Sequence, residues 1–127
     1  MVYLQWIGKQ LNMENEMQNE QHQMVLALAD EIARMEQNLA CMHEGTVGRK
    51  QLTRSLQRMK THLKIAGYEV VDMLGQPYQE GMKVVANFKF DETLPEGQQV
   101  ITAVVRPQVN YKGEMIQVAE IMVSQNF

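Results

Sequence analysis

The fold is decided by residues 4–42, LQWIGKQLNMENEMQNEQHQMVLALADEIARMEQNLACM. In alternating steps of three and four residues, this stretch carries an apolar ladder with a polar middle at Glu14, Gln18 and Gln21. The apolar members are Leu4, Ile7, Leu11, Val25, Leu28, Ile32, Met35, Leu39 and Met42. A seven-residue apolar repeat without proline predicts one long helix with a coiled-coil seam. At about 1.5 Å per residue the helix would span roughly 55–60 Å, so its seam needs a partner. A second copy of the chain is the simplest candidate, and we expect a homodimer.

Length and composition limit the functional classes. A chain of 127 residues normally forms one domain, or a small domain with an extension. The net charge of −3 argues against general affinity for nucleic acid or anionic membranes. The single cysteine, Cys41, excludes an internal disulfide and indicates a reducing compartment, so we expect a cytoplasmic protein. No apolar run reaches the length of a membrane span, and the first residues lack the features of a signal peptide.

The chain divides into three expected parts. Residues 1–45 form the long dimerising helix, which should end near Gly45 because glycine is favoured just past a helix end. Residues 46–66 form a shorter helix with Thr46 as its N-cap. Its apolar stripe repeats in steps of four and three and contains Leu52, Leu56, Met59 and Leu63. Residues 67–127 form a small β head.

The shorter helix is strongly basic and carries no acidic residue. Its cations are Arg49, Lys50, Arg54, Arg58, Lys60 and Lys64. We expect these side chains to face solvent or to pair with the acidic long helix. A nucleic-acid adaptor remains an alternative, although such surfaces usually also carry interleaved aromatic residues.

After Gly67 the apolar period changes from helical to two, which predicts short strands. We expect strands at residues 68–71, 82–91, 99–105 and 115–124, with a further short extended stretch at 109–111. Turn sequences separate them around Pro77, Pro95 and Gly113. The predicted fold class is therefore α+β, with a long coiled-coil helix, a shorter bundle-forming helix and a small antiparallel β head.

We find no pattern typical of a catalytic or metal site. His22, His43 and His62 lack metal-ligand spacing, and there is no cysteine pair. Cys41 and His43 lie close in sequence at a helix end, where a surface histidine beside a partly buried thiol is the ordinary structural situation. We expect no enzymatic activity, no cofactor and no metal ion.

The β head resembles that of GrpE-type nucleotide exchange factors, the dimeric cochaperones of DnaK-type heat-shock chaperones. The resemblance follows an ordered set of motifs over about 60 residues, behind a long and then a shorter helix. The motifs are GYEVV at 67–71, PY at 77–78, MKVVA at 82–86, LPEG at 94–97 and KGEMIQ at 112–117, followed by the strand at 118–123. Glu114 stands where the family has a basic residue after the hairpin glycine, so the chain is similar to a divergent member.

The resemblance implies a mechanical function. Two long helices would pair in parallel, and Leu52, Leu56, Met59 and Leu63 of both copies would form a four-helix bundle. One β head would then bind the ATPase domain of a DnaK-type chaperone and promote ADP release. By motif position, the implied contact residues are Val105, Arg106, Glu114 and Val123. The alternative is a homodimeric coiled-coil scaffold with a β cap and no exchange activity.

Overall fold

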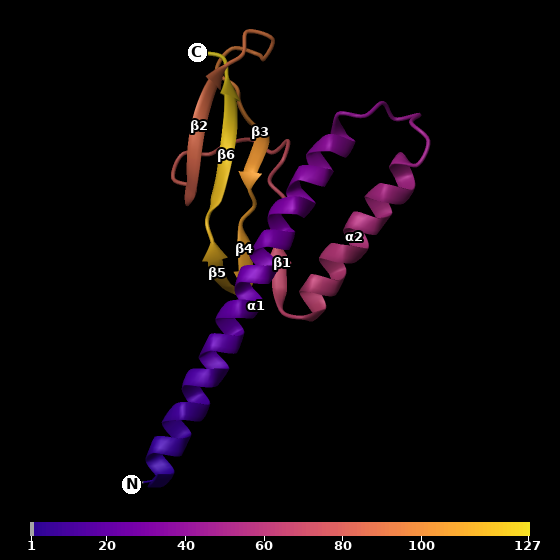
Figure 1. Cartoon of the computed structure of the whole chain (residues 1–127). Coiled ribbons are helices and arrows are strands. Elements are labelled where there is room, and N and C mark those ends of the chain that lie inside the picture. The colour runs from indigo at the N-terminus through magenta and orange to yellow at the C-terminus, as the bar shows by residue number, and fades with distance from the viewer. Residues whose placement is uncertain (1) are drawn as a thin grey trace.

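The structure is a computed structural model that describes residues 2–127, and it has two helices followed by six strands (Figure 1). The helices are α1 (Val2–Ala40) and α2 (Arg49–Ile65). The strands are β1 (Tyr68–Val70), β2 (Val84–Phe90), β3 (Gln99–Arg106), β4 (Val109–Tyr111), β5 (Glu114–Gln117) and β6 (Ala119–Gln125). Figure 1 shows α2 returning alongside the second half of α1, while the first half of α1 projects beyond the rest of the chain.

Helix α1 ends at Ala40, earlier than the predicted end near Gly45. Hydrogen-bond donors from the following residues, and not a glycine, satisfy the carbonyl of Leu39 in its last turn. The carbonyl of Leu39 accepts from Met42 N at 3.1 Å and from the Arg49 Nε at 3.0 Å. A cationic side chain on a free carbonyl at a helix C-terminus is favourable. Arg49 therefore joins the end of α1 to the start of α2.

The prediction of Thr46 as the N-cap of α2 is wrong. The N-cap is Gly48, at φ 89°, and no side chain caps the helix. Glycine adopts this left-handed conformation without strain, and its carbonyl accepts the first helical bond, from Leu52 N at 3.0 Å.

The β head contains two three-stranded sheets. The first, sheet A, has the order β1-β4-β5, and its hairpin turn at Lys112 and Gly113 has positive φ at both residues, as a type I′ turn requires. The second, sheet B, has the order β2-β6-β3. The chain passes from sheet B into sheet A between β3 and β4, and returns to sheet B between β5 and β6. The predicted single strand at 115–124 is thus divided at Val118.

The prediction of a purely antiparallel β head is wrong, because β2 and β6 pair in parallel. Strand β6 lies between β2 and β3, so these neighbours in sequence do not pair with each other. Pro107 falls between β3 and β4, where it has no N–H to give to a ladder. Sheet B is therefore mixed, with β6 as its central strand.

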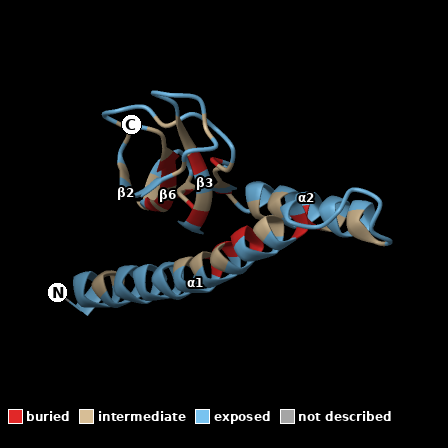
Figure 2. Cartoon of the chain, turned by 90° about the horizontal axis from the view of Figure 1, so that it is seen from above, coloured by how far each residue is buried: buried red, intermediate tan, exposed pale blue. Residues whose placement is uncertain are grey.

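Three apolar clusters hold the chain together. The first lies inside the β head between sheet B and residues 71–82, and includes Met73, Ile101, Ile121 and Val123. The second joins α1 to sheet A through Val25, Ala29, Tyr68 and Val109. The third joins α1 to α2 through Ile32, Leu39 and Leu56. Figure 2 shows the resulting contrast along α1, whose buried residues all lie in its second half, while its N-terminal half is exposed almost all round.

Neither helix within residues 2–127 has the length of uninterrupted apolar sequence that crossing a membrane requires.

Candidate functional site

The part of the chain that the structure describes brings no three His, Cys, Asp or Glu side chains together as a metal site. Cys41 is exposed, and His43 Nδ1 accepts from Gly45 N at 3.1 Å. His43 thus supports the turn after α1. The candidate functional regions described next are exposed surfaces.

An exposed apolar surface runs along α1 and shares Leu28, Met35 and Met42 with the predicted seam. We call it the Met stripe, and it consists of Trp6, Met13, Met17, Met24, Leu28, Met35 and Met42. These residues are 39% to 66% exposed. Their intervals of seven and four residues place the members within α1 on one face of the helix, and Met42 follows directly after its end. A continuous exposed apolar strip of this kind marks an interaction surface.

Part of the predicted seam is buried within the chain itself. Its members Val25, Ile32 and Leu39 are buried against sheet A and α2, as is Leu56 of α2. Their side chains belong to the intramolecular core, and Leu39 and Leu56 also line a groove between the two helices. Leu63 is also partly buried in this core, and Ile7 is half-buried. The remaining predicted dimer residues are exposed: Leu4, Leu11, Leu28, Met35, Leu52 and Met59.

A shallow apolar groove continues the Met stripe between the two helices. It has a volume of about 180 Å³ and is lined mainly by Met35, Leu39, Met42, Leu52, Leu56 and Met59. Leu52 and Met59, both predicted for the bundle, are exposed at its α2 side. The groove and the Met stripe thus form one apolar surface with contributions from both helices.

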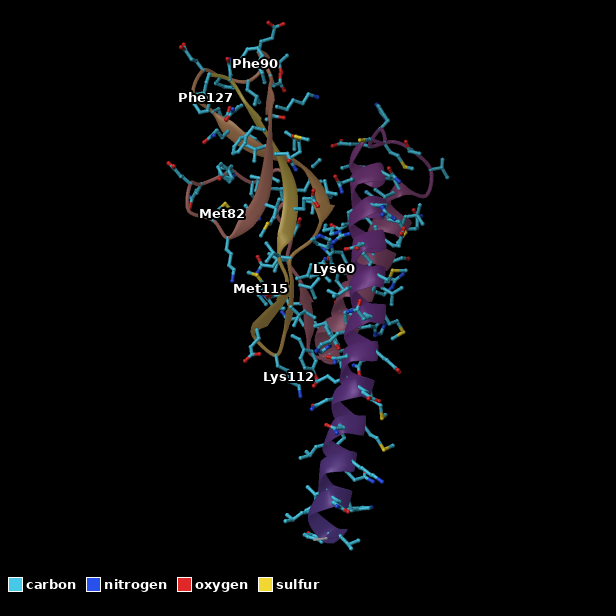
Figure 3. All side chains as sticks on the ribbon, turned by 60° about the vertical axis from the view of Figure 1, so that its left-hand side comes forward. Lys60, Met82, Phe90, Lys112, Met115 and Phe127 are labelled. Atoms are coloured by element: carbon cyan, nitrogen blue, oxygen red, sulfur yellow. The ribbon has the colours of Figure 1, made fainter. Side chains whose placement is uncertain are left out.

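The basic residues of α2 divide between structural contacts and solvent. Lys60 Nζ lies 2.7 Å from Glu36 of α1, and both side chains are mostly buried. Figure 3 shows Lys60 directed into the space between α1 and the β head. Arg49 bonds the end of α1, as described above, whereas Lys50, Arg54, Arg58 and Lys64 are exposed.

The four head residues implied by the resemblance do not form one patch. Val105 and Arg106 are adjacent and exposed at the end of β3. Glu114 is exposed beside the β4–β5 turn, separated from them by the length of that hairpin. Val123 is fully buried in the core of sheet B, so its assignment as a contact residue is wrong.

The side chain of Gln37 fixes the β head to α1. The sequence did not indicate this role, because Gln37 is one of many polar residues of α1. Its Nε2 donates to Val104 O at 2.7 Å, and its Oε1 accepts from Val104 N at 3.0 Å. The amide of Gln37 therefore pairs with the outer edge of β3 as a neighbouring strand would.

A second connection between α1 and the head is aromatic. His22 Nδ1 lies 2.5 Å from the hydroxyl of Tyr68, whose side chain is fully buried. The rings of His22 and Tyr111 meet edge to face, with centroids 4.7 Å apart. Burial, followed by the proximity of Tyr111, raises the pKa of Tyr68 above its ordinary value.

The polar middle of the predicted seam faces this same region. Glu14, Gln18 and Gln21 line a shallow surface hollow together with Met17 and Tyr111. The amide of Gln21 also acts on Tyr68 and lowers its pKa, against the larger effect of burial. Polar residues interrupt the ladder at the place where α1 passes the tip of sheet A.

No protein-family model matches the chain, and no curated protein matches it either.

Proposed function

We propose that the chain is a homodimeric, GrpE-like nucleotide exchange factor that promotes ADP release from a DnaK-type chaperone through its β head. One observation carries the proposal: the ordered motifs from Gly67 to Gln117 all belong to one β head that is firmly joined to a long helix. The connection consists of the Gln37 and His22 contacts and the mostly buried pair between Lys60 and Glu36. A rigidly mounted head is what a mechanical exchange factor needs.

The Met stripe supports the dimeric part of the proposal. In parallel, in-register pairing each stripe residue meets its own copy, so the apolar surface is matched along its full length. The groove at Leu52 and Met59 would be covered by the same contact, adding α2 to the interface. The first half of α1, which contacts little else in its own chain, would gain its packing from the partner copy.

The head would act by binding the open chaperone more tightly than the closed one. A change from mostly closed to mostly open, such as 1:99 to 99:1, requires about 5.5 kcal/mol of differential affinity. Val105, Arg106 and Glu114 are the exposed head residues proposed to contact the chaperone. The negative charge of Glu114 would select an ATPase domain with a basic residue at the facing position.

The direct test is the release of fluorescent ADP from the ATPase domain of a DnaK-type chaperone from the source organism. We expect accelerated release with the full-length protein and a clear loss with Arg106→Glu. Gln23→Ala, an exposed substitution on α1 far from these contacts, serves as the control. Unchanged release rates over a wide range of protein concentration would refute the proposal.

The second candidate is a homodimeric scaffold with a β cap, favoured by the charge reversal at Glu114. It predicts a dimer in light scattering without any effect on ADP release. Glu114→Arg separates the candidates further, since restoring the basic residue should improve exchange only if the head contacts a chaperone.

A further inference from the structure

The two edges of sheet B differ in how their backbone groups are satisfied. The outer edge of β3 is covered by residues 75–78 and by Gln37. Gly75 N donates to Ile101 O at 2.8 Å, Ile101 N to Gln76 O at 2.9 Å, and Tyr78 N to Gln99 O at 3.1 Å. Together with the two bonds from Gln37 to Val104, these contacts replace a neighbouring strand. This edge is closed to further pairing.

The outer edge of β2 is open. Asp91 N, just past the strand, donates to Gln125 O at 2.8 Å, which shows that this side of the backbone faces β6. Backbone groups alternate in direction along a strand, and the β2–β6 register is unbroken from residue 84 to residue 90. The N–H and C=O groups of Ala86, Phe88 and Phe90 therefore point away from β6. Within residues 2–127 none of them has a hydrogen-bond partner.

Aromatic side chains lie beside this edge. All three phenylalanines of the chain are exposed: Phe88 by 50%, Phe90 by 60% and Phe127 by 71%. Tyr78 packs edge to face on Phe88, with ring centroids 5.5 Å apart. Figure 3 shows Phe90 and Phe127 at the end of the β head that is remote from the projecting half of α1. The protein thus keeps its phenylalanine rings at least half exposed, and two of them lie on β2.

The charges along β2 indicate which kind of segment fits. Lys83 precedes the strand and Lys89 lies within it, and both are exposed. Neither forms an ion pair in the part of the chain that the structure describes. Lysine on an open edge discourages pairing with basic or neutral strands and favours an acidic one.

We propose that β2 binds an extended, acidic segment of a partner polypeptide by strand addition. The backbone of the segment pairs with Ala86, Phe88 and Phe90, and alternate apolar residues pack on Phe88 and Phe90. Its acidic residues lie next to Lys83 and Lys89. This mode of recognition takes affinity from main-chain bonds and specificity from alternate side chains. The inference does not depend on the exchange activity proposed above.

The test uses a fluorescein-labelled nine-residue peptide in which valine alternates with glutamate and threonine, and two N-methylated forms of it. One form is methylated at every valine and the other at every glutamate and threonine. Only one set of N–H groups can face β2, so one form should bind like the parent and the other at least about tenfold more weakly. Weaker binding of the form methylated at valine indicates that the peptide adds antiparallel to β2. Weaker binding of the form methylated at glutamate and threonine indicates that it adds parallel. Equal binding of both forms, or no binding of the parent, overturns the proposal.

Two further measurements locate the site. Ala86→Pro removes an outward N–H without breaking the ladder to β6, so it should weaken peptide binding about fivefold or more while leaving the urea midpoint nearly unchanged. Amide hydrogen exchange covers the case in which this variant does not fold. The amides of Phe88 and Phe90 should exchange fast in the free protein and slow at least about tenfold with the peptide. Protection of these amides without peptide, rising with protein concentration, would show self-pairing and overturn the proposal.

Discussion

Replacing Gln37 by alanine should loosen the β head from α1. The change removes both bonds to Val104 and leaves the N–H and C=O of that residue without partners. Val104 is only 8% exposed, so water reaches these groups poorly. A small cavity of about 20 Å³ already lies beside them, lined by Gln37, Val104 and Lys60 among others.

The expected loss of stability follows from these two groups. An unsatisfied buried donor or acceptor costs about 1–3 kcal/mol. Truncation enlarges the cavity enough for a water molecule to enter and restore part of the bonding, so we place the total at about 2–4 kcal/mol. Alanine is also the better helix former, and this effect opposes the loss by a few tenths of a kcal/mol.

Urea unfolding followed by circular dichroism measures the effect. With a slope of about 2 kcal/mol per molar, the midpoint should fall by about 1–2 M. Gln23→Ala, on an exposed face of the same helix, measures the helix-propensity contribution alone. Gln37→Glu tests the geometry, since a carboxylate accepts from Val104 N but repels Val104 O. Its midpoint should rise as the acid becomes protonated at low pH and can donate again. A midpoint shift of less than about 0.3 M in Gln37→Ala would show that the bonds from Gln37 to Val104 do not hold the β head to α1.

Three other predictions concern α1 and its contacts. The pKa of Tyr68 is raised on folding, so its contribution to stability should be complete below the ordinary value of 10.0 and should be lost as pH rises through the folded-state value. The urea midpoint of the parent protein should therefore fall between about pH 9 and 11, and Tyr68→Phe should remove this dependence on pH. Met24→Lys, in the middle of the Met stripe, should convert a dimer into the 14.6 kDa monomer in light scattering, and a monomeric parent protein would contradict the stripe as a dimer interface. The Lys60–Glu36 pair should show a coupling energy of about 1 kcal/mol in a double-mutant cycle, above that of an exposed pair, because both side chains are mostly buried; additive single changes would count against it.

The helices and most strands were predictable because their signals are local. The heptad spacing of residues 4–42 and the alternation at 84–90 indicate a helix and a strand whatever their surroundings. The lysine and glycine at 112–113 likewise predicted the hairpin turn that the structure contains. Fold class α+β follows from these elements.

Strand order and the use of each helix face were not predictable, because they depend on contacts distant in sequence. Neighbouring strands usually pair, and nothing in the residues of β2 and β3 indicates that β6 lies between them. The ladder and the Met stripe are both apolar, and only the positions of sheet A and α2 decide that Val25 and Ile32 belong to the core. Gln37 could not be distinguished from the other glutamines of α1, since its role depends on the backbone of a strand 67 positions away.

The central place of β6 has a consequence for biosynthesis. Strands β2 and β3 emerge from the ribosome first, but they meet only through β6, so sheet B cannot assemble until residues 119–125 have left the exit tunnel. Until then the apolar face of β2 and β3 and the outward groups of the nascent strands stay uncovered. Helix α1 can form early because its bonds are local, whereas sheet B has to wait for β6. The nascent chain is therefore most exposed to aggregation, or to capture by chaperones, between the emergence of β2 and the emergence of β6.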